Sequence, residues 1–408
     1  MRAKVNNLPV LTFSKLKLNS AELEYNNDST KVEKLAAELL SDDGEKTFAC
    51  EMPENISVKK DVPTEEVNSL FESLNTRVGR ENVVAGKFPM YNEQLFATGM
   101  GAEADALFDE AGILTDVYEV SAGSKSATPV IFKYDITEGT NGLVRRFIHV
   151  KSGAAVSIVF LYAASAEEFK KEVSADEVGK KGIVGASTRI YVEEGASVKI
   201  ASVQLLNKGF TFFEDFGTIQ CEGASLKFTK VDLGAGKVYE GFNANQKGDE
   251  SDFDCAYGFI GEKDSFTDIN YNDVFFGKKT NGVMRFNGAL IDNAFKNWRG
   301  TVDFRQGCVA ASGDEEENVL LFGEDIVNKT IPLILCEEED VEGRHASTLG
   351  KIADDQLFYM QTRGISLKEA EELIVRASVN SVNSGVPSSE IRSAVRERID
   401  AIFERRSR

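Results

Sequence analysis

Few side chains of this chain are equipped for chemistry, since its 408 residues include only two histidines and five cysteines. One histidine, His345, follows an acidic run at residues 337–340, and Cys336 lies directly before that run. An imidazole can ligate iron through one nitrogen while a carboxylate fixes the other, and a thiolate is a soft ligand for the same metal. His345 and Cys336 are therefore the candidate iron ligands, provided that the thiol faces the imidazole.

Each of these features also has an ordinary structural interpretation. His345 could cap a turn, and Cys336, which ends the apolar strand 331–335, could be a small core residue. The acidic run lacks the spacing of a calcium loop and is typical of a solvated turn. The five cysteines are far apart, odd in number and never form a Cys-x-x-Cys pair. This pattern argues against a disulfide framework and against a four-cysteine metal site.

Composition and missing motifs exclude several classes of function. The net charge of −19 argues against binding to nucleic acid or to an anionic membrane surface. No Gly-x4-Gly-Lys-Ser/Thr motif occurs, so we expect no ATP hydrolysis by this chain. No apolar run approaches about 18 residues, and the first residues lack the apolar segment of a secretory signal. We therefore expect a cytoplasmic protein.

The elements that position His345 and Cys336 are predicted to be strands. From residue 113 the apolar pattern has period two, and a Gly-Ala-small-aliphatic-x-apolar motif recurs at 153–158, 195–200 and 223–228. Such units cannot bury a face alone and must stack. Residues 165–171 form the one short helix expected in this region, which disfavours a βαβ sheet. A β-sandwich stays an alternative, but the irregular repeat and the turn glycines favour a β-solenoid.

Helices are predicted on both sides of this β region. Residues 1–112 are expected to be mixed and mainly helical. The three expected helices follow the capping box Thr30-x-x-Glu33, begin near Pro63, and cover Tyr91 to Thr98. Residues 351–408 are expected to be helical throughout. This segment has a capping box at Ser366-x-x-Glu369, a break at 384–387 and a last amphipathic helix.

The joint between the β region and the last helices resembles the C-terminal part of the SufB/SufD family, the scaffold proteins of the SUF iron–sulfur cluster assembly system. His345 follows the SufD pattern, because SufB usually has glutamate there. The resemblance implies a mainly β protein whose core, 113–350, is a right-handed parallel β-helix. The matching segments are Pro332-Leu333-Ile334, Asp340-Val341-Glu342, His345-Ala346-Ser347-Thr348, Asp355-Gln356-Leu357-Phe358-Tyr359 and Arg363-Gly364-Ile365.

The resemblance also implies a function and partners. The chain would be a non-enzymatic, SufD-like scaffold that pairs edge to edge with a SufB-like protein and binds a SufC ABC-type ATPase through its last helices. His345 would lie where a transient iron–sulfur cluster forms, with no cofactor bound tightly by this chain alone. ATP-driven closure of two ATPase subunits would move the scaffolds. The expected ATPase-docking residues are Gln356, Phe358, Tyr359, Arg363, Gly364 and Ile365.

Two positions depart from the family pattern. Many SufD sequences have a cysteine two residues before this histidine, where this chain has Gly343. SufB has a cysteine ahead of the strand that matches 320–322, and the nearest residue here is Glu317. Without these thiolates we expect that the chain does not hold a cluster alone.

Two other functions remain open from the sequence. A β-helical enzyme acting on polysaccharide would need clustered carboxylates, which Asp252, Asp254 and Asp303 could supply. A homo-oligomeric scaffold would pair the edge strand of one copy with that of another.

Overall fold

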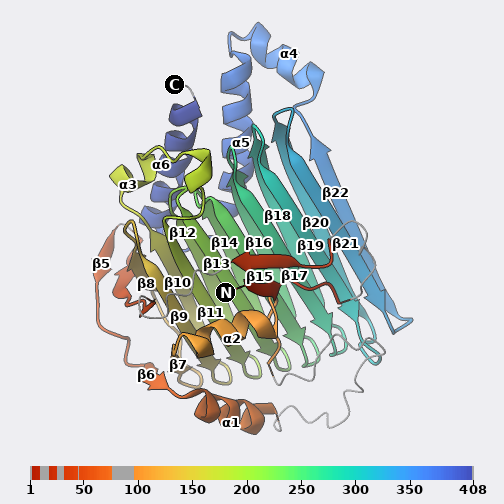
Figure 1. The fold of residues 1–408 in the computed structure, drawn as a ribbon. Coiled ribbons are helices and arrows are strands. Elements are labelled where there is room, and N and C mark those ends of the chain that lie inside the picture. Colours follow the sequence, from red (N-terminus) through yellow and green to blue (C-terminus); the bar gives the residue numbers. More distant parts are fainter. Residues whose placement is uncertain (1, 10–17, 25–31, 45, 76–95, 407–408) are drawn as a thin grey trace.

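The computed structural model describes residues 2–9, 18–24, 32–44, 46–75 and 96–406. Parallel strands coil from Thr115 to Gly350, and each turn of the coil adds one strand to each of two facing sheets (Figure 1). The first sheet contains β7 (Thr115–Val120), β9 (Asn141–Val150), β11 (Gly182–Val192), β13 (Phe210–Gln220), β15 (Lys237–Gln246), β17 (Phe266–Phe275), β19 (Phe295–Phe304) and β21 (Val327–Cys336). The second contains β8 (Val130–Asp135), β10 (Ala155–Ala163), β12 (Ser197–Leu205), β14 (Ser225–Leu233), β16 (Asp252–Gly261), β18 (Asn281–Ile291), β20 (Ala311–Phe322) and β22 (Val341–Gly350).

The recurring glycine motif marks the same corner of successive turns. Ala155 pairs with Ser197, which in turn pairs with Ser225, so the three motifs stack in register. Gly153, Gly195 and Gly223 have φ angles of 68°, 63° and 60°, a left-handed conformation that glycine adopts without strain. The prediction of a β-solenoid built from this repeat is confirmed.

The inner faces of the two sheets form one continuous core. Alternate residues of each strand point inward, and large aromatic rings from neighbouring turns stack along the axis. The ring centroids of Phe216 and Phe242, on neighbouring strands of one sheet, lie 5.5 Å apart, and those of Tyr257 and Tyr271, which face each other across the core from β16 and β17, lie 5.8 Å apart. Stacking between turns buries inward-pointing apolar side chains that a single turn would leave exposed to water.

The first sixty residues correct the expectation of a mainly helical N-terminal segment. The strands are β1 (Arg2–Val5), β2 (Ala21–Glu24), β3 (Glu33–Lys34), β4 (Glu38–Asp42), β5 (Thr47–Ala49) and β6 (Ile56–Val62), followed by helices α1 (Thr64–Asn75) and α2 (Ala102–Glu110). The helix predicted after Thr30-x-x-Glu33 is wrong, because this stretch pairs with the open first turn instead. Strand β3 pairs with β9, and β4 pairs with β8.

The predictions of the other two N-terminal helices have different outcomes. The helix predicted near Pro63 is α1, and it buries Val67, Phe71 and Leu74. The helix predicted over Tyr91 to Thr98 falls largely outside the described residues.

The C-terminal segment is helical, as predicted. Helices α4 (Asp354–Thr362), α5 (Leu367–Asn383) and α6 (Ser389–Arg406) follow β22. The Ser366 side chain caps α5 reciprocally with Glu369. Helix α5 packs on β14, β16 and β18, and α6 packs on α5 and β14. No helix of the described residues is long and apolar enough to cross a membrane.

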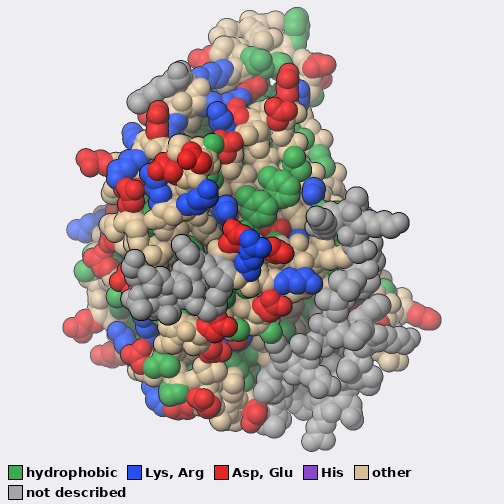
Figure 2. All heavy atoms as spheres, viewed as in Figure 1, with side chains coloured by type: hydrophobic (Ala, Val, Ile, Leu, Met, Phe, Trp, Pro, Cys, Tyr) green, Lys and Arg blue, Asp and Glu red, His purple; other side chains and the backbone are tan. Residues whose placement is uncertain are grey.

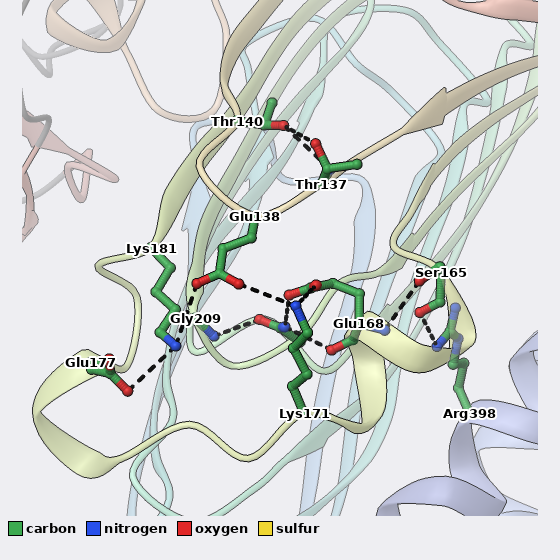
Figure 3. A network of polar contacts seen from close by, with 11 residues as sticks. Thr137, Glu138, Thr140, Ser165, Glu168, Lys171, Glu177, Lys181, Gly209 and Arg398 are labelled. Carbon is green, nitrogen blue, oxygen red and sulfur yellow. Dashed lines mark hydrogen bonds and ion pairs between the residues drawn. The ribbon is translucent and has the colours of Figure 1, made fainter.

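Helix α6 is also fastened to a corner of the solenoid, shown in Figure 3. The corner carries α3 (Ala166–Lys170), the short helix predicted from the sequence, and a 3-10 turn at Ala175–Glu177. Arg398 of α6 donates to the Ser165 carbonyl at 3.3 Å, and Glu138 lies 3.2 Å from Lys171. The last helix is therefore anchored to the outer side of the solenoid at this corner.

Candidate functional site

Within the described part of the chain, the solenoid ends in two strands that have a neighbour on one side only. Strand β21 is the terminal strand of the first sheet and β22 that of the second. Every residue from Glu342 to Leu349 is exposed, although the matching residues of β20 are alternately buried. The last turn therefore presents unpaired backbone groups and an uncovered inner face at one end of the molecule (Figure 1).

His345 lies on the inner side of this uncovered face. It pairs in register with Glu315 of β20, and two residues further on Ser347 pairs with Glu317. The Ser347 hydroxyl donates to Glu317 Oε2 at 3.2 Å, which shows that this set of alternate side chains points inward. Residues paired in register on neighbouring strands point to the same face of the sheet. The exposed imidazole of His345 therefore lies on the inner side of the open end.

Cys336 lies at the same end of the molecule but not beside His345. It closes β21, is exposed, and its thiol donates to the Glu338 carbonyl at 3.0 Å. His345 is four residues beyond Val341, a rise of roughly 13 Å from the turn that follows Cys336. Among the described residues no three His, Cys, Asp or Glu side chains gather as a metal site. The two predicted iron ligands are thus not brought into one ligand set by this chain.

The acidic run between them forms a turn held by backbone hydrogen bonds. Glu338 Oε2 accepts from the Gly307 amide at 2.9 Å, and Glu338 Oε1 accepts from Glu339 at 2.9 Å. The hydrogen bonds from Gly307 and Glu339 lower the pKa of Glu338. This arrangement agrees with the interpretation of the run as a solvated turn.

Sequence reasoning missed a polar cluster beneath His345. Glu317 is fully buried and contacts Lys296, while Thr330 donates to its Oε2 atom at 2.7 Å. The position that resembles a SufB cysteine therefore carries a buried carboxyl group in contact with Lys296, and burial lowers the pKa of this lysine well below its ordinary value. A usable signal was present, because four successive acidic residues, 314–317, in a strand of period two must send every second carboxylate inward.

The predicted ATPase-docking residues lie on and after α4, which projects past the tips of the strands at the top of the view in Figure 1. Phe358 and Tyr359 are 68% and 59% exposed, which is unusual for aromatic side chains. The Arg363 guanidinium lies 5.2 Å from the centre of the Tyr359 ring. Gly364 has a φ angle of 86° in the turn to α5, and Ile365 packs against the α5–α6 core. Gln356 is exposed in the first turn of α4.

The carboxylates considered for a polysaccharide enzyme do not converge. Asp254 projects outward from β16, where it contacts Lys227 at 3.1 Å and Arg285 at 3.0 Å. Asp252 lies on the same outward face. Asp303 is buried in β19 of the opposite sheet and contacts Arg305 at 2.6 Å. These three residues therefore supply no catalytic pair.

A cavity of about 480 Å³ lies at the other end of the solenoid, near β4 and β6. Tyr118, Phe132 and Tyr134 line it, together with the aliphatic stem of Lys34. The Lys34 ammonium lies 2.6 Å from Asp116 and 2.7 Å from Asp61, so the N-terminal segment is pinned across this end. This end of the solenoid is covered, whereas the end with His345 is open.

The fold and the open end at β21 and β22 together define a class of protein. It is a parallel β-solenoid with one covered end, one open end and helices packed on one side. Residues 135–378 match the family model described as SUF system FeS cluster assembly, SufBD core domain. This match covers more than half of the chain, which therefore belongs to that family.

Individual relatives agree with this assignment. The iron–sulfur cluster assembly protein SufD of Bacillus subtilis is 23% identical over 233 residues, which cover 56% of this chain and 51% of the relative. SufD of Plasmodium berghei is 22% identical over 221 residues, or 53% and 16% of the two chains. SufD of Escherichia coli is 28% identical over 102 residues, or 25% and 24%. The matched part thus spans about half of the Bacillus protein and less of the other two.

Proposed function

We propose that this chain is a SufD-like, non-enzymatic scaffold subunit of an iron–sulfur cluster assembly complex. Its partners would be a SufB-like scaffold and a SufC-like ABC ATPase. The open last turn is the observation that carries this proposal. A β-solenoid needs its terminal strands covered, and a second solenoid with the same kind of end would supply the missing strands.

The exposed inner face supports pairing at this end. Ile334 of β21 and Leu349 of β22 are 37% and 46% exposed, although their register neighbours Val302 and Val319 are buried. Pairing would bury these apolar side chains and enclose His345 at the junction. His345 would then serve as one ligand to a transient cluster whose thiolates come from the partner.

The ATPase would dock on α4. Phe358 and Tyr359 are both exposed on a helix whose main neighbour among the described elements is α5. Aromatic side chains of this kind are typical of interface anchors. The ATPase would supply the energy, since this chain has no phosphate-binding loop of the P-loop type.

A co-purification experiment tests the proposal. The tagged chain should recover a β-solenoid partner and an ABC ATPase from its native lysate. Phe358→Ala with Tyr359→Ala should lose the ATPase and keep the solenoid partner. Phe48→Ala, which alters another exposed aromatic residue far along the chain, is the matched control.

Deletion of the last helices would be a poorer test, because α5 and α6 bury Val375, Val379 and Ile399 in the core. Recovery of the chain alone would overturn the proposal. A stable homodimer in that case would favour the alternative of a homo-oligomeric scaffold. The cytoplasmic location and the absence of a tightly bound cofactor stay predictions.

A further inference from the structure

The cavity at the covered end of the solenoid has no part in the proposed function. It measures about 480 Å³ and lies between the first turn and the N-terminal segment that covers this end. The cover is fixed by backbone pairing, since the Leu35 amide donates to the Leu143 carbonyl at 2.9 Å. A β-carbon added to Gly142 would lie 2.1 Å from Leu35 Cδ2, so Leu35 occupies the space that this glycine leaves. The cavity is therefore built into the fold.

Most of the cavity wall is apolar. The rings of Tyr118 and Phe132, whose centroids lie 5.2 Å apart, form part of it. Such a wall offers water few hydrogen bonds, whereas an apolar group would remove this surface from water. The lining therefore favours a ligand with an apolar body. Four apolar side chains of the cover also line the cavity and are only partly buried, although they pack against the solenoid core: Leu35, Leu39, Met52 and Val58.

The polar groups of the lining are unevenly paired. The Lys34 ammonium lies 2.7 Å from Asp61 and 2.6 Å from Asp116, so it serves both carboxylates of the lining. The Lys60 ammonium and the Tyr118 hydroxyl have no hydrogen bond and no ion pair with any residue in the described part of the chain. Burial raises the pKa of Tyr118, so its hydroxyl keeps the proton and can donate it. Because both unpaired groups are donors, the ligand must bring an acceptor, and the ammonium favours an anionic one.

The volume of the cavity indicates the length of the ligand. At roughly 30 Å³ for each water-sized group, the cavity has room for about 16 such groups. A straight-chain carboxylate with about 12–14 carbons has roughly this number of heavy atoms. Small-molecule sites in proteins commonly measure about 300–1,000 Å³ and combine a mostly apolar lining with a few polar groups. The cavity thus has the size and the composition of a ligand site.

We propose that this cavity binds a medium-chain carboxylate, with the chain against the apolar wall and the carboxylate at Lys60 and Tyr118. The two donors come from neighbouring strands, because Tyr118 of β7 pairs in register with Val58, two residues before Lys60 on β6. Lys60 is exposed, so the carboxylate stays near water while the chain is buried. The site lies at the end of the solenoid away from His345 and does not depend on the proposed function.

Calorimetric titration of the full-length chain with sodium dodecanoate, kept below its micelle concentration, tests the site. Wild-type protein should bind one dodecanoate per chain. Lys60→Gln and Tyr118→Phe should each weaken binding about three- to tenfold, because each removes one donor to a charged acceptor. Lys59→Gln is the matched control and should bind like wild type, since Lys59 is the adjacent residue of β6 and contacts Glu66.

Dodecanol is the second probe, because it has the same chain without the charge. Wild-type protein should bind dodecanol more weakly than dodecanoate, and Lys60→Gln should bind dodecanol as wild type does. Dodecanoate should also raise the midpoint of thermal unfolding of wild-type protein, since a ligand that binds only the folded state stabilises it. Lys60→Gln alters an exposed side chain and should fold normally.

Wild-type protein that does not bind dodecanoate overturns the proposal. Equal weakening by Lys59→Gln and Lys60→Gln also overturns it, because binding would then follow surface charge rather than the cavity. Dodecanol that binds as tightly as dodecanoate would contradict the assignment of an anionic ligand. A lowered midpoint of thermal unfolding would show that dodecanoate binds the unfolded chain instead of a site in the folded one.

Discussion

The Nζ atom of Lys230 lies 2.6 Å from the Oε2 atom of Glu214, and both side chains are completely enclosed within the solenoid. The same ammonium lies 3.0 Å from Glu240 and 3.3 Å from Asp232. Burial raises the pKa of Asp232 and of Glu240, so part of the negative charge is held as protonated acid. One lysine thus contacts three carboxyl groups inside the solenoid, and Arg146, also fully buried, lies 3.6 Å from one of them, Glu214.

Lys230→Met should destabilise the protein by about 3–5 kcal/mol, because it leaves Asp232 and Glu240 buried without a cation and leaves Glu214 with Arg146 alone, at 3.6 Å. Urea unfolding, followed by circular dichroism, measures this change. Lys227→Met on the same strand is the matched control, since Lys227 faces outward and contacts Asp254 at 3.1 Å. The control should lose no more than about 1 kcal/mol. Equal effects of the two substitutions would contradict the role given to Lys230.

Asp273 predicts a pH dependence of stability. Burial raises the pKa of Asp273 to about 8, although the hydrogen bonds that it accepts from Gln246 at 2.9 Å and 3.1 Å act to lower this pKa. The nearby charge of Asp252 raises the pKa further. The unfolded chain loses this proton near pH 4 and the folded chain near pH 8, so stability from this group is complete below about pH 4 and falls as the pH rises to about 8.

The substitution Asp273→Asn should remove this loss. Relative to wild type, the variant should gain stability on going from pH 5 to pH 8, on the order of a few kcal/mol in the free energy of unfolding. Asp254→Asn, which alters an outward-facing carboxylate, is the control and should show no such trend. Parallel pH profiles for wild type and Asp273→Asn would show that Asp273 does not hold a proton in the folded state.

Leu349→Asp should prevent pairing of the chain with a second solenoid. Leu349 is 46% exposed on the inner side of β22, and a charge there would be buried by the partner. Size-exclusion chromatography with the co-purified scaffold measures complex formation, and thermal unfolding confirms that the isolated chain is intact. Leu114→Asp alters a leucine that is 38% exposed just before β7, at the covered end, and should leave pairing unchanged. Loss of pairing in both variants would argue against an interface at β22.

Gly195→Ala should cost roughly 1–2 kcal/mol through backbone strain alone. Its φ angle is 63°, and no atom lies within 4 Å of the position of an added β-carbon, so steric contact plays no part. Gly350→Ala is a matched control with the same open space and no positive φ angle. If the two substitutions have equal effects on the midpoint of urea unfolding, the left-handed turn is not what requires glycine.

The sequence was informative wherever structure depends on local pattern. Period-two alternation, the repeated turn glycines and the capping box at Ser366 each depend on a few neighbouring residues, and each was found as expected. The segment after Thr30 was predicted wrongly, because its apolar residues fit a helical face as well as a pairing strand. Only the presence of an open first turn at β8 and β9 decides between them.

Surface chemistry could be anticipated less well than the fold. In the view of Figure 2, acidic and basic side chains are interspersed with apolar ones, and the net charge of −19 does not locate any site on that surface. His345 was found from its motif alone. Its surroundings were not, because Lys296, Gly300 and Glu315 lie 49, 45 and 30 residues earlier in the chain and come to this end of the solenoid only through the stacking of turns.

The sequence by itself determined that this chain forms a β-solenoid with helices at its C-terminus, and it singled out His345. These properties follow from periodicity, turn chemistry and a linear motif, which act over short distances along the chain. Only the tertiary structure decided that Cys336 lies apart from His345, that Glu317 is paired with Lys296, and that Glu315 is buried without a partner. The register between turns sets these relationships, and it is fixed by packing of the whole core.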